Sequence, residues 1–454
     1  MNSMMAAFRG SRLRSRALRS ASWILIGYSG SQGMRLAANL ILTRLLFPEA
    51  FGMMALVGVV TVGLAMFSDV GISPSISQSP RGEDPDFLNT AWTIQVIRGV
   101  ALWLTACVLA WPVAWFYDAP DLALYLPVAG LSLLIAGFNP TRIETAQRRL
   151  LVGRLTLLDL AGQAVAIIAM VVLAWVFQSV WALVVGTVIG ALATLLLTHM
   201  GLPGLVNRFR WEPAAADELI RFGKWIFLST AFWFLSSQGD KAILGKFLSL
   251  ETLGVYNIGY FLAAFPLALA HAVSGKVLIP IYREAPPKDS PANAAKLRRL
   301  RHALGLSILA LLLVAALLGP AIVDVLYDAR YTHSGAMLVL LAVAQISQVA
   351  GLTYDQAALA AGDSRRFFVF SCLRAILQVG LLLIGVTLFG LIGALVATGI
   401  AMLATHPIAI WLARRHGVWD PLHDALIFGI GGIGAALALW LHWGAILAMA
   451  AATT

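Results

Sequence analysis

Long apolar runs alternate with short polar connectors along nearly the whole chain. An α-helix of roughly 20 apolar residues is long enough to cross the hydrocarbon core of a bilayer. By this measure the sequence predicts twelve membrane-spanning helices, followed by an apolar stretch at 423–450 that forms one helix or a shallow pair. The predicted spans cover residues 20–44, 51–72, 87–117, 121–144, 154–178, 179–203, 221–248, 252–281, 300–328, 333–361, 366–389 and 391–413.

Composition supports this interpretation. Hydrophobic residues make up 60% of the 454 residues and charged residues 12%, and the mean hydropathy is +0.84. A soluble domain has about 45–50% apolar and about 25% charged residues. We therefore expect an all-α polytopic membrane protein. The two cysteines, Cys107 and Cys372, lie in apolar runs and indicate neither a disulfide nor a metal site.

The basic residues indicate how the chain is oriented. With the N-terminus inside, most of the 32 lysines and arginines lie in the N-terminal segment and the inward connectors. The outward connectors hold only Arg44, Lys246 and Arg330. Because basic connectors mark the cytoplasmic side, we predict a cytoplasmic N-terminus and a retained first span. The same connectors explain the net charge of +10, so no nucleic-acid partner is predicted.

An internal repeat relates the two halves of the chain. LTRLLFPEAFG at 42–52 matches LGKFLSLETLG at 244–254 at a constant offset of 202, which aligns Gly52 with Gly254. The repeat period contains six predicted spans, and an even number gives both halves the same orientation in the membrane. Two parallel six-helix bundles that face each other enclose a cleft, which is typical of an alternating-access transporter.

These features divide the chain into five predicted segments. They are a basic cytoplasmic segment at 1–19, an N-lobe of six helices at 20–203, a cytoplasmic linker at 204–220, a C-lobe of six helices at 221–415 and an extra membrane segment at 416–454. The twelve-helix core is thus extended by one or two C-terminal helices.

Three segments resemble bacterial polysaccharide and oligosaccharide flippases of the multidrug/oligosaccharidyl-lipid/polysaccharide exporter superfamily. They are ILTRLLFPEAFGMMAL at 41–56, FLNTAWTIQVIRG at 87–99 and SSQGDKAILGKFLSLETLGVYNIGY at 236–260. The resemblance implies two six-helix lobes arranged as a V in the bacterial inner membrane. It also implies translocation of an undecaprenyl-diphosphate-linked glycan for surface polysaccharide biosynthesis, with a polysaccharide polymerase as a conceivable partner. The family core has twelve helices and some members have fourteen, so the stretch at 423–450 departs from both patterns.

Basic residues inside predicted spans are candidates for binding the diphosphate. Charges at membrane depth are costly and normally face a protein interior or a wet cavity, and the planar fork of arginine suits a diphosphate. The candidates are Arg35, Arg98, Arg374 and Lys276, with Gln32 and Asn39 on the face of Arg35. The alternative is an ion pair or a polar packing contact between helices, and for Lys276 a side chain that reaches the inner interface.

Acidic residues inside spans are candidates for coupling transport to an H+ or Na+ gradient. Asp240 shares a helical face with Ser236, and Asp355 shares one with Gln345 and Gln348. The alternative for Asp355 is pairing with a nearby arginine. His271 either titrates or has a hydrogen-bonded structural role. No cofactor is predicted.

The sequence contains no nucleophile elbow, P-loop, HExxH motif or paired-cysteine metal spacing, so we expect a transporter and not an enzyme. Three other functions remain open. A small-molecule or multidrug exporter would have a smaller, more acidic cavity. A glycan polymerase or ligase would need a large outward loop, and the outward connectors are short. A scaffold without transport would not need so many charges inside its spans.

Overall fold

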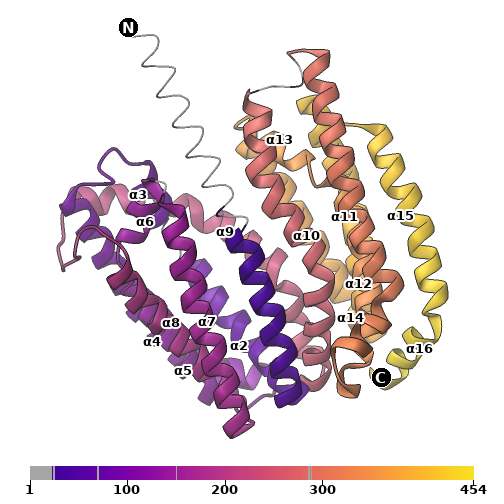
Figure 1. Cartoon of the computed structure of the whole chain (residues 1–454), viewed down its shortest axis with the longest axis horizontal. Coiled ribbons are helices and arrows are strands. Elements are labelled where there is room, and N and C mark those ends of the chain that lie inside the picture. Colours follow the sequence, from indigo (N-terminus) through magenta and orange to yellow (C-terminus); the bar gives the residue numbers. More distant parts are fainter. Residues whose placement is uncertain are drawn as a thin grey trace. The chain divides into compact units, whose positions relative to one another are not determined.

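The computed structural model describes residues 23, 26–68, 71–149, 151–284, 287 and 289–453; the side chains at 222–229, 273, 275–281 and 283–284 are not included. The described chain is almost entirely α-helical (Figure 1). It divides into two compact units, which are formed by residues 1–46 with 57–231 and by 47–56 with 232–454.

The first unit contains paired antiparallel helices. Its elements are a helix at 26–45, most of α2 (Pro48–Phe67), α3 (Ile72–Gln78), α4 (Pro85–Phe116), α5 (Leu122–Gly137), α6 (Arg142–Arg148), α7 (Val152–Phe177) and α8 (Trp181–Gly201). The most extensive packing joins α7 to α8 and α4 to α5. Glycines make this close approach possible, since Gly186 and Gly190 of α8 lie against Met170 and Ala166 of α7.

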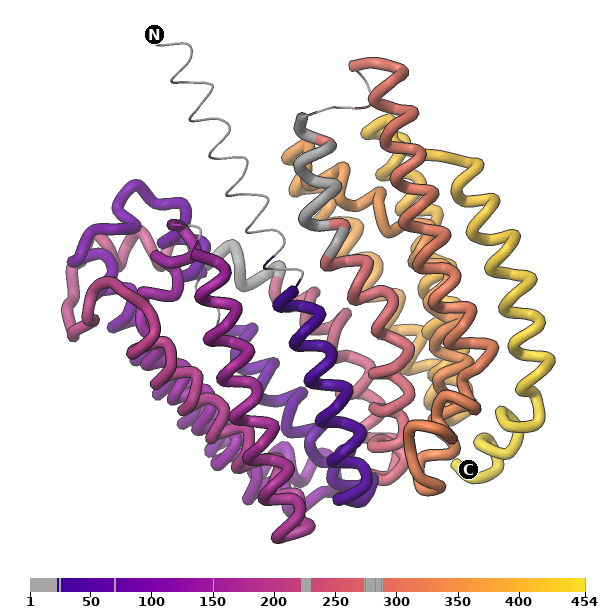
Figure 2. The backbone as a smooth tube through the Cα atoms, in the orientation of Figure 1, coloured from indigo at the N-terminus to yellow at the C-terminus, as the bar shows by residue number. Residues whose placement is uncertain are grey.

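The second unit is built around one buried helix, α12 (His333–Gly351), whose side chains are mostly buried. Helices α10, α11, α14 and α15 all pack against it, and Figure 2 traces their roughly parallel and antiparallel courses. The other elements are the part of α9 (Pro213–Phe247) from residue 232 onward, α10 (Leu250–Glu284), α11 (Pro291–Leu326), a 3-10 turn at Ala329–Tyr331, α13 (Tyr354–Ala360), α14 (Ser364–His416), α15 (Pro421–Leu441) and α16 (Trp443–Thr453).

Helix α14 has 53 residues, which is far longer than a bilayer crossing requires. It turns back on itself at Phe389 and Gly390, where Gly390 has φ +58°, a left-handed conformation that favours glycine. Gly385 and Gly393 then pack against each other with no room for a Cβ on either. The turn falls at the predicted boundary between the spans 366–389 and 391–413.

Local sequence explains where several helices begin. A polar residue followed by proline supplies a side-chain cap and a first helical residue with a preset φ. The pairs are Asp84–Pro85, Ser290–Pro291 and Asp420–Pro421, which begin α4, α11 and α15. Asp363 caps α14 in the same way, and the hydrogen bond from the Arg366 guanidinium holds the pKa of this carboxyl below its usual value.

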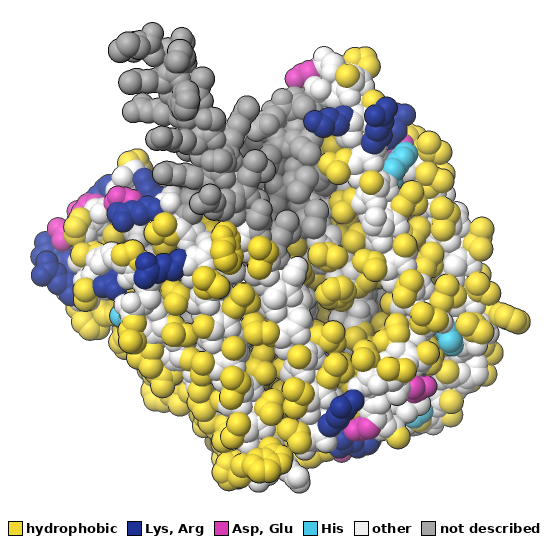
Figure 3. Space-filling view, in the orientation of Figure 1, with side chains coloured by type: hydrophobic (Ala, Val, Ile, Leu, Met, Phe, Trp, Pro, Cys, Tyr) yellow, Lys and Arg dark blue, Asp and Glu magenta, His cyan; other side chains and the backbone are white. Residues whose placement is uncertain are grey.

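In the described part of the chain, nine helices are long and apolar enough to cross a membrane, or ten if the bent pair α5 and α6 is one span. On the face drawn in Figure 3, hydrophobic side chains cover the lengths of the helices, and charged ones gather near helix ends. The prediction of an all-α polytopic membrane protein is thus confirmed. The apolar stretch at 423–450 forms the long helix α15 and the short helix α16.

The two copies of the sequence repeat meet in the structure. The first turns of α2 belong to the second unit, where they pack against the first turns of α10. A Cβ on Gly52 would overlap the carbonyl oxygen of Leu250, and a Cβ on Gly254 would overlap the carbonyl oxygen of Pro48. Gly52 and Gly254 are 202 residues apart, and so are Pro48 and Leu250. Equivalent residues of the repeat therefore make the same contact twice. This local two-fold relation is consistent with the predicted parallel repeat.

We expect alanine at Gly52 or Gly254 to lower the free energy of unfolding by about 1–3 kcal/mol, because the added methyl group must displace a backbone carbonyl. The matched control is Gly58→Ala in the same α2 helix, where no atom lies within 4 Å of an added Cβ. This control should be neutral or stabilise by about 0.5–1 kcal/mol. Thermal unfolding of the purified protein in detergent measures all three; equal effects at Gly52 and Gly58 would contradict the close contact.

Candidate functional site

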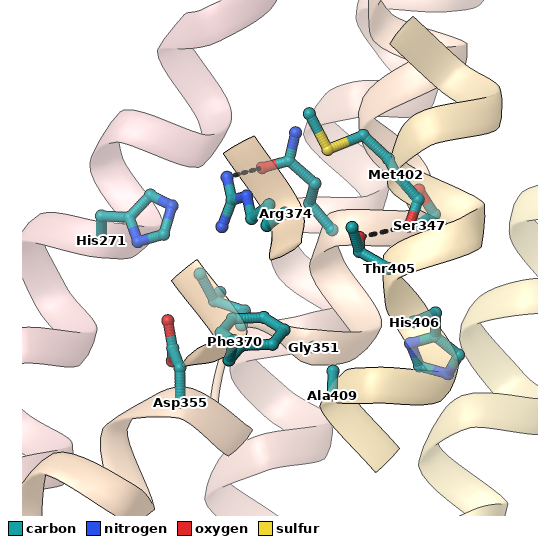
Figure 4. Close-up of a pocket in the computed structure, with 12 residues that line it drawn as sticks. His271, Ser347, Gly351, Asp355, Phe370, Arg374, Met402, Thr405, His406 and Ala409 are labelled. Carbon is teal, nitrogen blue, oxygen red and sulfur yellow. Dashed lines mark hydrogen bonds between the residues drawn. The ribbon is translucent and has the colours of Figure 1, made fainter. Parts of the chain in front are cut away.

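A small cavity lies inside the second unit, between α10, α12, α13 and α14. Its volume is about 30 Å³, which is room for about two water molecules. Four titratable or charged side chains line it: His271, Asp355, Arg374 and His406. Figure 4 shows these side chains, which come from α10, α13 and two separate parts of α14, around the same space. The cavity is suited to water or a small ion and is much smaller than a sugar ring.

Arg374 and Asp355 place opposite charges in this cavity. The Arg374 guanidinium donates a hydrogen bond to Gln348 Oε1 at 3.2 Å. Its Nε atom is buried and has no hydrogen-bond partner among the described residues, and the same is true of Asp355 Oδ1. Within the described residues, no ion pair of 4.0 Å or less joins the two side chains. Both groups therefore retain hydrogen-bonding capacity that faces the cavity.

A break between helices positions Asp355. The sequence predicts one continuous span at 333–361, but α12 ends at Gly351 and α13 begins at Tyr354. Asp355 consequently lies in the first turn of α13, where a carboxylate is favoured by the partial positive charge of a helix N-terminus. The break also interrupts the predicted polar face, so Gln348 lines the cavity and Gln345 is buried in α12.

Asp240 and Lys241 lie outside this cavity, and two tyrosines of α10 bind them. Tyr256 donates a hydrogen bond to the buried Asp240 carboxylate at 2.7 Å. The Lys241 ammonium lies 5.0 Å from the centre of the Tyr260 ring, a cation–π contact. The tyrosines are four residues apart on one face of α10. The adjacent charges of α9 are thus held against a single neighbouring helix.

The predicted polar stripe of the first span lies in the first unit. Arg35 is exposed, while Gln32 and Asn39 are half-buried in the helix at 26–45. Gln163 of α7 accepts a hydrogen bond from Ser31 at 2.7 Å, which ties the neighbouring turn of this helix to α7. The roles of Arg35, Gln32 and Asn39 in binding substrate stay predictions.

Arg98 binds the end of α2. Its guanidinium donates to the Ala65 carbonyl at 2.7 Å and to Ser68 Oγ at 2.9 Å. A cation at this position satisfies carbonyl groups that the helix leaves unpaired and opposes the partial negative charge of its C-terminus. The structure therefore gives Arg98 a polar packing contact between helices, the alternative to diphosphate binding that the sequence left open.

Arg98→Ala should lower the free energy of unfolding by about 1.5–3 kcal/mol, because hydrogen bonds from a charged donor are lost. Ser68→Ala is the matched control: it removes one acceptor and should cost about 1 kcal/mol or less. Thermal unfolding in detergent gives both values. If Arg98→Ala instead leaves stability unchanged and stops transport, the residue acts on substrate and not on α2.

Lys276 lies in α10, but its side chain is outside the described residues, so its predicted role is not tested.

Sequence reasoning missed a buried polar cluster at the start of α15. Asp424 accepts hydrogen bonds from Tyr354 at 2.7 Å and from Trp419 at 3.0 Å, and Arg301 is 3% exposed. The signal lies in the run WDPLHD at 419–424. Asp420, His423 and Asp424 have helical spacing there and come directly before an apolar run. The charge pattern alone places Arg301 among the basic residues of an inward connector and gives no sign that it is buried.

The sequence matches the profile of a family described as "Polysaccharide biosynthesis protein" over residues 41–336. Similar curated proteins include the lipopolysaccharide biosynthesis protein WzxC of Escherichia coli K12, which is 22% identical over 84% of this chain and 77% of the relative. The succinoglycan biosynthesis transport protein ExoT of Rhizobium meliloti is 21% identical over 80% of this chain and 73% of the relative.

Solved structures share the fold. The lipid II flippase MurJ in an inward closed conformation has a TM-score of 0.68 and 11% identity, covering 93% of this chain and 99% of that one. An inward-facing multidrug resistance MATE transporter of the MOP superfamily has a TM-score of 0.63 and 16% identity, covering 85% and 94%. At such identities the likeness establishes the fold alone. Since the family profile extends over more than half of the chain, this protein belongs to the polysaccharide biosynthesis protein family.

Proposed function

We propose that this protein is a flippase that moves a lipid-linked oligosaccharide or polysaccharide repeat unit across the bacterial inner membrane. The observation that carries the proposal is its membership of the polysaccharide biosynthesis family, with relatives of similar length named for lipopolysaccharide biosynthesis and succinoglycan transport. The fold is that of MurJ, which is named a lipid II flippase. ExoT is named a transport protein and MurJ a flippase, so the chain is taken to be a transporter and not an enzyme.

The glycan head group must cross the bilayer while its lipid remains in the hydrocarbon. Alternating access meets this requirement, because a hydrated passage opens first to one side and then to the other. We place the N-terminus in the cytoplasm, as the basic connectors favour. Arg35 is our leading candidate for binding the diphosphate, since it is an exposed arginine in the middle of an apolar helix.

The cavity in the second unit suits ion coupling better than substrate binding. With a volume of about 30 Å³ it accommodates water or an ion, but no diphosphate-sugar. We therefore assign Arg374 to the coupling machinery beside Asp355 and no longer to the substrate. The Arg374 guanidinium repels a metal cation in the same cavity. A proton, by contrast, can bind to the Asp355 carboxylate while the guanidinium stays in place. We accordingly favour H+ over Na+ as the coupling ion, with Asp240 as a second coupling group.

A deletion strain tests the proposed function. Loss of the gene should cause a polyprenyl-diphosphate-linked glycan to accumulate in the inner membrane and surface polysaccharide to disappear, and mass spectrometry of extracted lipids measures the first effect. Restoration by the wild-type gene on a plasmid is the control. Altered drug sensitivity without lipid accumulation would favour the small-molecule exporter, whose fold is shared.

The product of flipping is the substrate expected of a polysaccharide polymerase, so such an enzyme is the proposed membrane partner. A polymerase deletion should leave the flippase active and let single repeat units reach the outer leaflet.

A further inference from the structure

His406 lies between the cavity and the buried carboxylate of Asp424. The side chains are 10% and 11% exposed, and His406 Nε2 is 3.4 Å from Asp424 Oδ2. Asp424 is held in place by hydrogen bonds from the Tyr354 hydroxyl to Oδ1 and from the Trp419 indole to Oδ2. Two side chains, one from α13 and one from the connector before α15, thus fix the carboxylate that faces the imidazole.

The other side of His406 faces the cavity. His406 lines it together with Asp355 and Arg374, and Figure 4 shows the imidazole on the opposite side from His271 and Asp355. Neither ring nitrogen has a hydrogen-bond partner among the described residues: Nε2 makes only the 3.4 Å contact with Asp424, and Nδ1 is free. A histidine with a purely structural role normally has its buried nitrogens paired. The free nitrogen is instead available to whatever fills the cavity.

A second histidine–carboxylate pair lies one helical turn away along α15. His302 Nε2 is 3.2 Å from Asp420 Oδ2, and Arg298 approaches the same oxygen at 3.4 Å. The side chain of His302 is 21% exposed and that of Arg298 is 61% exposed, so this pair reaches the surface. The polar cluster at the start of α15 therefore extends from His302 at the surface of α11 to the His406–Asp424 pair, which contacts the cavity.

The charges around His406 come from every element of the cluster. The titratable and charged groups are His271 and Tyr282 of α10, Arg301 and His302 of α11, Tyr354 and Asp355 of α13, Arg374 of α14, and Asp420, His423 and Asp424 at the start of α15. Arg301 is directed to Thr353, Tyr282 and the Tyr354 ring. The group in direct contact with the imidazole is the Asp424 carboxylate, which stabilises imidazolium.

We infer that His406 and Asp424 form a proton-binding site that exchanges protons with the cavity, an inference that rests on the proposed proton-coupled flippase. His406 takes up a proton on its free ring nitrogen from a hydronium ion in the cavity, which becomes water, and the Asp424 carboxylate stabilises the imidazolium that forms. The imidazolium later returns this proton to a water molecule in the cavity. The site is thus a reservoir that supplies Asp355.

The test follows the protonation of His406 in the full-length protein in nanodiscs by NMR of 15N-labelled histidine. The variant H406Q identifies the signal among the eight histidines. We expect the imidazolium form of His406 to be detected in the wild-type protein. Its absence at every pH at which the protein stays folded would overturn the proposal, and this part of the test requires no change at Asp424.

Two substitutions of Asp424 separate proton binding from structural support. Asp424→Asn keeps the shape and an acceptor for Tyr354, whereas Asp424→Glu keeps the titratable carboxyl and alters the shape. We expect Asp424→Glu to preserve imidazolium formation and proton-driven transport, and Asp424→Asn to abolish the first and reduce the second at least tenfold. The reverse order, with the isosteric amide as the better replacement, would show a structural anchor and overturn the inference.

The two proposals can fail separately. The NMR measurement contains no glycan, so proton binding at His406 is established or excluded whatever the substrate is. Lipid accumulation in the deletion strain, by contrast, tests the flippase function without reference to His406. Asp420→Asn serves as a matched variant at the neighbouring pair and should leave imidazolium formation at His406 unchanged, because its carboxylate contacts His302 and not His406.

Discussion

Replacing Arg374 with alanine will lower the free energy of unfolding by about 3 kcal/mol and abolish glycan export, because it leaves the Asp355 carboxylate buried without its opposite charge. Gln348 also loses the hydrogen bond that the guanidinium donates, which leaves the oxygen of this half-buried side chain unpaired. Thermal unfolding in detergent measures the first effect, and staining of surface polysaccharide in a complemented deletion strain measures the second.

The double variant Arg374→Ala with Asp355→Asn provides the stronger test. Removing both charges should recover at least half of the lost stability, since no uncompensated carboxylate remains. Export should not recover, because the proposed coupling group is gone. Additive stability losses in the double variant would show that the two side chains do not interact across the cavity.

Arg366→Ala is the matched control on the same helix. Arg366 lies in the first turn of α14 and forms an exposed ion pair with Asp363 at 2.6 Å. Exposed pairs of this kind contribute only about 0–1 kcal/mol. The control should therefore fold, insert and export almost as the wild type does. It distinguishes the effect of losing any arginine of α14 from the effect of losing Arg374.

The fold could largely be predicted from hydropathy and glycine positions. The turn of α14 at Gly390 follows from a glycine between two apolar runs, and the contact of Gly52 with α10 lies in the segment that the sequence repeat had aligned. The break between α12 and α13 could not be predicted in this way. The few polar residues after Leu352 lie between the apolar residues up to Val349 and Ala350 and the apolar run at 357–361, so a window of mean hydropathy passes over the break.

The candidate site could be predicted only in part. Charges inside apolar runs identified Arg374 and Asp355 individually, because each is costly at membrane depth. Their common cavity depends on how α13 packs against α14, which a helical face of one segment cannot reveal. Arg98 illustrates the same limit, because one of its two acceptors at the end of α2 is the backbone carbonyl of Ala65, which the pattern of side chains does not reveal.

Arg35→Ala should abolish or reduce glycan export at least tenfold while the protein remains folded and inserted. The paired, charge-assisted hydrogen bonds that an arginine makes to a phosphate contribute about 1.5–3 kcal/mol, which corresponds to tenfold or more in affinity. Because the side chain is exposed, its removal should change the free energy of unfolding by no more than about 0.5 kcal/mol. Immunoblotting of membranes and surface-polysaccharide staining measure abundance and export together.

Two further substitutions make this result specific to position and chemistry. Arg35→Lys keeps the charge without the planar fork, so export should be intermediate between wild type and Arg35→Ala. Arg44→Ala removes another exposed arginine from the same helix, near its end, and should leave export intact. Full export by Arg35→Ala at wild-type abundance would remove this residue from the binding of the diphosphate. Equal losses at Arg35 and Arg44 would instead indicate that the helix requires positive charge in general, because only a site that contacts the head group distinguishes two arginines separated by nine residues.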